Sequence, residues 1–138
     1  MNIFQYLHFV ALSLRYPSRR DYLRGGIGIL ERYHRCRSFW DRHLRLSSDF
    51  IQAVVKAQRP NRICILGAGR LLDVPILTLS SSAKEVTLID CDPGALASWR
   101  AARKTLRARG TALTFGLFDI TGRIDDWTAQ LLALSARC

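Results

Sequence analysis

A glycine turn that links two strand-like runs constrains the fold of this chain most strongly. Residues 63–66 form a short apolar run, typical of a buried strand, that stops at Gly67-Ala68-Gly69. A second run, residues 85–90, ends at Asp90, 23 residues after Gly67. Strand, glycine turn and helix form a layout in which backbone N–H groups meet a nucleotide-like ligand. An acid at the tip of the second strand is placed to hold a ribose hydroxyl pair.

Strands and helices alternate over the second half of the chain. We expect strands at 62–66, 85–90 and 112–117 and helices at 70–80, 93–109 and 124–136. This alternation predicts an α/β fold with a Rossmann-like parallel sheet of three strands in the order 3-2-1. Cys64 lies inside the first strand, where a thiol serves as a small core residue.

The first 60 residues are predicted to be helical. Apolar residues at spacings of three and four indicate helices at 2–14, 27–44 and 49–57, with Ser47 or Ser48 capping the last. Gly25, Gly26 and Gly28 indicate a turn or a loosely formed helix start. We expect residues 1–60 to form a helical cap or flank on a partial Rossmann-like domain at 61–138.

The charge is positive and uneven. The chain carries +10 overall, with 11 basic against 4 acidic residues in 1–60 and 10 against 7 in 61–138. Such an Arg-rich half suits RNA, an anionic membrane surface or an acidic partner. A solvated helical face is the favoured interpretation, because basic and aromatic residues do not alternate as they do where bases stack. Nucleic acid is therefore an open but unfavoured partner.

The cysteines indicate a reducing compartment. Cys36, Cys64, Cys91 and Cys138 are far apart and form no C-x-x-C pair. We interpret all four as reduced thiols of a cytoplasmic chain. No apolar run reaches the length of a membrane span, and no His, Cys or Asp spacing indicates a metal site.

The order of these elements resembles class I S-adenosylmethionine-dependent methyltransferases. The resemblance rests on the strand and G-x-G turn, on the strand Val86-Thr87-Leu88-Ile89-Asp90, and on Phe118-Asp119 after the third strand. Over 30–122 the chain is similar to a bacterial group of such proteins, through Leu66-Gly67-Ala68-Gly69, Asp73-Val74-Pro75, and the preceding Arg37, Trp40, His43 and Leu44.

The resemblance implies S-adenosyl-L-methionine as the cofactor. The loop of Leu66, Gly67, Ala68 and Gly69 would pass under its methionyl part, and Asp90 would accept hydrogen bonds from its ribose hydroxyls. The methyl acceptor and the catalytic residues stay unassigned, because the acceptor-binding part of such enzymes follows a fourth strand.

The adenine would be held by three further residues. The resemblance implies that Cys91 packs near the ring, that Asp119 faces the adenine amino group and that Ile120 lies against the ring. Carboxylates suit hydroxyl and amine donors, and a flat ring suits apolar contact. Two alternative interpretations remain. Asp90 could cap the following helix, and Asp119 could form an Asx turn.

The chain departs from the family pattern at two positions. The family has an acid where Ile65 stands and a third glycine, in its G-x-G-x-G form, where Leu71 stands. A non-catalytic Rossmann-like binding module is therefore an alternative function. An NAD(P)-binding oxidoreductase fragment is less favoured, since its fingerprint requires a small residue where Leu72 stands.

Two more residue types have competing interpretations. Asp73 is predicted to be a first-turn acid favoured by a helix dipole rather than a catalytic base. His34 and His43 are expected to be surface or packing residues.

The predicted sheet has an open side. With three strands the doubly wound fold is incomplete, and the strand 62–66 has an unpaired edge. We expect the chain to be a piece of a longer protein; pairing with another chain through this edge, or coverage by the N-terminal helices, are the alternatives.

Overall fold

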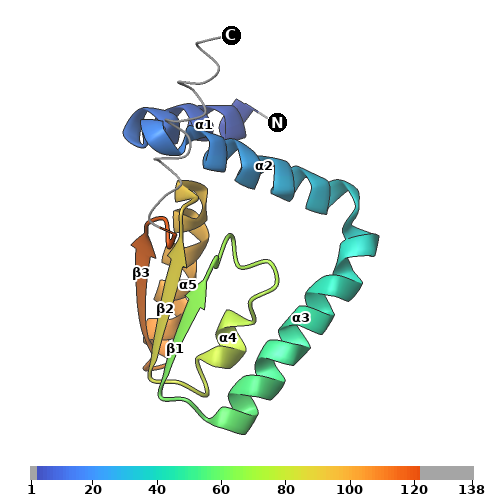
Figure 1. The fold of residues 1–138 in the computed structure, drawn as a ribbon, viewed down its shortest axis with the longest axis vertical. Helices are drawn as coiled ribbons and strands as arrows, with labels where there is room; N and C mark the ends of the chain where they lie inside the picture. The colour runs from blue at the N-terminus through green and yellow to red at the C-terminus, as the bar shows by residue number, and fades with distance from the viewer. Residues whose placement is uncertain (1–2, 122–138) are drawn as a thin grey trace.

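The computed structural model describes residues 3–121 and has a three-stranded sheet with helices before and between its strands (Figure 1). Helices α1, α2 and α3 precede the sheet, with a 3-10 turn η1 between the first two. The elements are α1 Ile3–Arg15, η1 Pro17–Arg19, α2 Arg20–Arg35, α3 Arg37–Gln58, β1 Arg62–Leu66, α4 Ile76–Leu79, β2 Glu85–Asp90, η2 Pro93–Ala95, α5 Leu96–Ala108 and β3 Ala112–Leu117.

The sheet confirms the strand predictions. Both pairings are parallel, and the order β1-β2-β3 is the expected order read from the opposite edge. The register pairs Leu66 with Ile89 and Asp90 with Leu117, so the three strands end at one carboxyl edge. An α/β fold with a parallel sheet is therefore present, and within the described residues β1 is an edge strand.

The core lies between one face of the sheet and α5. Val86, Leu88, Trp99 and Leu106 are fully buried there, and Ile63 and Ile65 of β1 pack against them. The other face is open, so the prediction that Cys64 is a core residue is wrong: its side chain is exposed. A strand alternates its side chains between faces, and no helix of the described chain covers the face to which Cys64 belongs.

The N-terminal helices differ from the prediction in their breaks. Gly25, Gly26 and Gly28 lie inside α2, not in a turn. The helical structure is interrupted instead at Cys36, between α2 and α3. Helix α3 then runs without interruption through Ser47 and Ser48, neither of which caps a helix. The Ser48 hydroxyl accepts a hydrogen bond from the Gln52 side chain (3.1 Å), which leaves the helix intact.

Helix α4 is much shorter than predicted. Residues 70–75 are irregular, and the helix occupies only Ile76–Leu79. Leu71 has a left-handed backbone (φ 61°), and Pro75 disfavours a helical conformation of Val74. The glycine turn is therefore followed by a loop rather than by a helix N-terminus.

The segment after β2 agrees with the predicted helix at 93–109. Pro93 opens η2, which leads into α5, and Gly110 follows the helix with φ 78° as a C-terminal stop requires. The predicted helix 124–136 lies outside the described residues. None of the helices between residues 3 and 121 has the length and apolar character that a membrane crossing needs.

Candidate functional site

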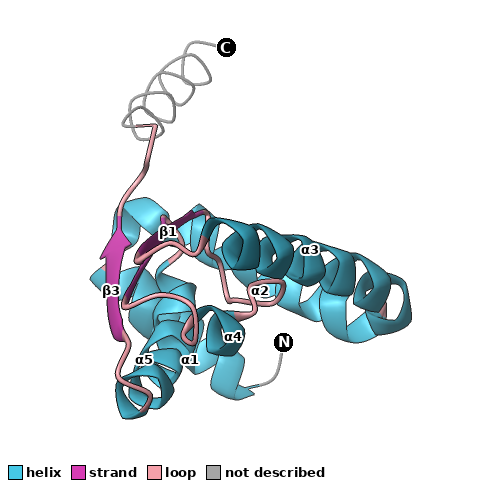
Figure 2. Ribbon diagram, turned by 90° about the horizontal axis from the view of Figure 1, so that it is seen from below, coloured by secondary structure: helices cyan, strands magenta, loops and turns pink. Residues whose placement is uncertain are grey.

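A cavity of about 490 Å³ lies between the glycine turn and the N-terminal helices. The lining residues come from the turn and the end of β2 on one side and from α2 and α3 on the other. Figures 1 and 2 show how these elements are arranged. Its lining combines aromatic, apolar and acidic side chains with backbone: Asp21, Tyr22, Gly25, Gly26, Ile29, Trp40, His43, Leu44, Gly67, Ala68, Gly69, Arg70, Leu72, Asp73, Asp90 and Asp92.

The glycine turn is held by strand β2. Gly67 (φ 68°) and Gly69 (φ 50°) adopt left-handed conformations that glycine tolerates at little cost. The N–H groups of Gly67 and Ala68 both donate to the carbonyl of Ile89, at 2.9 and 3.1 Å. Leu71 is left-handed as well (φ 61°), a backbone conformation that glycine adopts more readily than leucine.

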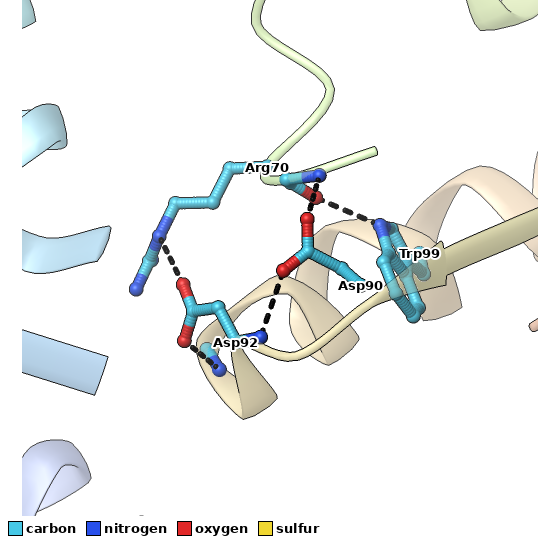
Figure 3. A network of polar contacts seen from close by, with 6 residues as sticks. Arg70, Asp90, Asp92 and Trp99 are labelled. Atoms are coloured by element: carbon cyan, nitrogen blue, oxygen red, sulfur yellow. Dashed lines mark hydrogen bonds and ion pairs between the residues drawn. The ribbon is translucent and has the colours of Figure 1, made fainter. Parts of the chain in front are cut away.

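Asp90 fastens the turn with both carboxylate oxygens (Figure 3). Its Oδ2 accepts from the Gly69 N–H at 2.7 Å, and its Oδ1 accepts from the Asp92 N–H at 2.8 Å. Trp99 binds the next peptide group of the turn, since its Nε1 donates to the Gly69 carbonyl at 2.8 Å. Asp90 does not cap the following helix. That role belongs to Asp92.

Asp92 is a buried residue of the cavity lining. Its Oδ1 accepts from the Gly94 N–H at 2.7 Å, and its Oδ2 lies 3.8 Å from the Arg70 Nε. Burial raises the pKa of the Asp92 carboxyl, and its bond from Gly94 and the charge of Arg70 oppose that rise only in part. Gly26 of α2 comes so close to this carboxylate that no side chain fits between them.

The second wall was missed by the sequence prediction. Tyr22, Ile29, Trp40 and Leu44 come from α2 and α3. His43 is exposed, as the surface interpretation expected, and it lines the cavity as well. Gly26 was the available signal, because a helix-interior glycine often marks a close approach. Its partner Asp92 could not be named without the tertiary fold.

The predicted site residues divide into two groups. Gly67, Ala68, Gly69 and Asp90 line the cavity together. The others, which do not line it, are Leu66, Cys91, Asp119 and Ile120.

The second group has local contacts of its own. Leu66 and Ile120 are exposed, and the Cys91 carbonyl accepts from Arg19 at 3.3 Å. Burial, followed by the negative charge of Asp90, raises the pKa of the Cys91 thiol. Asp119 forms an Asx turn, with its Oδ1 accepting from the Thr121 N–H at 2.8 Å.

The lining indicates which ligands the cavity suits. Four aspartates and one arginine line it, although the whole chain carries +10. This balance favours groups that donate hydrogen bonds or carry positive charge. Asp73, predicted as a first-turn acid, lies in the irregular loop before α4 and faces the same space. Between residues 3 and 121 no cluster of His, Cys, Asp and Glu is arranged to hold a metal ion.

Comparison with known proteins assigned no family. No family model, no curated protein and no solved structure matches the chain.

Proposed function

We propose that this chain is the cofactor-binding portion of an S-adenosylmethionine-dependent methyltransferase. The observation that carries the proposal is the joint presence of Gly67, Gly69 and Asp90 in one cavity at the carboxyl edge of a parallel sheet. Ligands of α/β sheets bind at this edge. The cavity of about 490 Å³ is within the usual size range of small-molecule sites.

The free capacity of Asp90 supports this proposal. A carboxylate offers about four acceptor positions, and the two backbone N–H groups occupy one on each oxygen. The remaining positions can accept from the two ribose hydroxyls. The surrounding aspartates complement the sulfonium and ammonium groups of the cofactor. Methyl transfer is a displacement at the sulfonium carbon, in which the protein mainly positions the acceptor and balances charge.

A non-catalytic binding module is the second candidate function. The structural basis for it is that the turn N–H groups of Gly67, Ala68 and Gly69 are all bonded within the protein. No helix begins directly after the turn to replace them as donors, because α4 starts only at Ile76. An NAD(P)-binding role is less favoured, because a diphosphate would meet Leu72 and several carboxylates instead of a helix N-terminus.

Ligand-induced thermal stabilisation tests these alternatives. S-adenosylhomocysteine at about 100 times its Kd should stabilise the chain by about 2.7 kcal/mol, a Tm rise of roughly 10 °C, whereas NADH should not. No rise with either ligand would favour the non-catalytic module, and a rise with NADH alone would favour the oxidoreductase.

Substitution of Asp90 tests the assignment of the site. Asp90→Ala should abolish the rise with S-adenosylhomocysteine. It should also lower the free energy of unfolding by about 2–4 kcal/mol, since two charge-assisted hydrogen bonds are lost. Calorimetric titration below the variant's melting range separates the two effects. Asp41→Ala is the matched control and should bind like the wild type, because Asp41 is a half-exposed acid on α3, paired with Arg37 at 3.7 Å, that does not line the cavity. Equal binding by Asp90→Ala would refute the ribose assignment.

A further inference from the structure

The guanidinium of Arg70 lies in the cavity wall with its hydrogen-bonding capacity unsatisfied. Its side chain is 17% exposed and extends toward Asp92, as Figure 3 shows. The Arg70 Nε lies 3.8 Å from the Asp92 Oδ2, which is too long for a hydrogen bond. This Nε is buried and has no hydrogen-bond partner among the residues that the structure describes. A charged group out of water is stable only when it is paired and hydrogen-bonded, so the guanidinium gains from a further acceptor.

The fold keeps a place for this guanidinium. A Cβ on Gly94 would overlap the Arg70 Nη2, and a Cβ on Gly26 would lie 3.5 Å from its Nε. Two positions without side chains, one in η2 and one in α2, therefore leave the space that the group occupies. Because Arg70 lines the cavity although its Nε is buried, its terminal nitrogens are the donors that a ligand can reach.

The charge of Arg70 sets it apart from the rest of the lining. Among the described residues that line the cavity, it is the single Lys or Arg side chain, beside four aspartates. These acids repel any anionic group of a ligand, and the guanidinium is the group that offsets the repulsion. Arginine binds a carboxylate through two parallel N–H···O bonds in one plane. A diphosphate carries more negative charge and meets more repulsion from the same acids, so the site favours a carboxylate.

We propose that Arg70 binds the carboxylate of the ligand and determines the specificity of the cavity for an amino-acid group. The inference rests on the proposed function, in which the ribose belongs to Asp90 and the methionyl part of S-adenosylmethionine passes the glycine turn. The carboxylate of that methionyl part binds the terminal nitrogens of Arg70, while its ammonium group faces the acids of the lining. The cavity therefore selects nucleosides with a complete amino-acid end over decarboxylated ones.

Two ligands that differ only in the carboxylate test this proposal. S-adenosylhomocysteine and its decarboxylated analogue, in which hydrogen replaces the carboxylate, are titrated calorimetrically into the full chain. The wild type should bind S-adenosylhomocysteine at least about tenfold more tightly than the analogue. Arg70→Met should raise the Kd of S-adenosylhomocysteine by about 10- to 100-fold and leave that of the analogue unchanged, so that the preference disappears. Arg70→Lys keeps the charge without the planar fork and should give an intermediate Kd for S-adenosylhomocysteine.

Arg100→Met is the matched control, because Arg100 is an exposed arginine on α5 that does not line the cavity. It should bind both ligands as the wild type does. Equal binding of the two ligands by the wild type overturns the proposal, and this comparison requires no variant to fold. Equal weakening of both ligands in Arg70→Met also overturns it, since Arg70 then only holds the cavity wall in place. In both of these outcomes S-adenosylhomocysteine binds the wild type and the proposed function stands. If neither ligand binds the wild type, the proposed function and this inference are both refuted.

Discussion

Gly26→Ala should destabilise this protein, although alanine usually stabilises a helix. Gly26 lies inside α2, where the exchange normally contributes about 0.5–1 kcal/mol of stability. Here the added Cβ would overlap the Oδ2 atom of Asp92 and lie 2.9 Å from its Cγ. Asp92 is 8% exposed and cannot swing into solvent without breaking its 2.7 Å bond from the Gly94 N–H.

The expected magnitude follows from these opposing effects. Loss of a buried hydrogen bond to a charged group costs about 1.5–3 kcal/mol. After the helix gain is subtracted, Gly26→Ala should lower the free energy of unfolding by about 1–2 kcal/mol. Gly25 and Gly28 are matched controls in the same helix, because a Cβ there meets nothing within 4 Å. Gly25→Ala and Gly28→Ala should each raise the free energy of unfolding by about 0.5–1 kcal/mol.

Urea unfolding followed by tryptophan fluorescence measures the three variants. A Gly26→Ala protein as stable as Gly28→Ala would refute the packing of α2 on Asp92. The double variant Gly26→Ala with Asp92→Ala isolates the cause. In the Asp92→Ala background the clash is absent, so the glycine exchange should become neutral or stabilising.

Two further predictions concern the polar network around the glycine turn. Because burial raises the pKa of Asp92, its carboxyl stays protonated to higher pH in the folded protein than in the unfolded chain. The free energy of unfolding therefore falls as the pH rises above 3.8, the ordinary pKa of an aspartate. The Tm of Asp92→Asn should therefore improve relative to the wild type between about pH 4 and pH 7, and a constant difference would contradict this sign. Trp99→Phe should lower the free energy of unfolding by about 1–3 kcal/mol. It removes the hydrogen bond to the Gly69 carbonyl and puts a smaller ring in place of a fully buried side chain. Urea unfolding measures the loss, and hydrogen exchange at the Gly69 N–H should speed up with it; an unchanged rate would show that Trp99 does not hold the turn.

Part of the candidate site could be predicted from the sequence, because it depends on strand ends. Gly67, Gly69 and Asp90 terminate neighbouring parallel strands, so they had to meet at one edge. Asp119 also follows a strand, but β3 is the far strand and its acid closes a local turn with Thr121. Proximity along an edge of the sheet falls with each strand that intervenes.

The sequence by itself determined the three strands and the glycine turn that ends the first of them. These features depend on short apolar runs and on backbone conformations, both of which are local. Only the tertiary structure decided that Cys64 is exposed, that α2 continues through Gly26, and that Trp40 and His43 line the same cavity as the glycine turn. Burial and side-chain neighbours depend on which elements pack together, and segments far apart in the sequence set that packing.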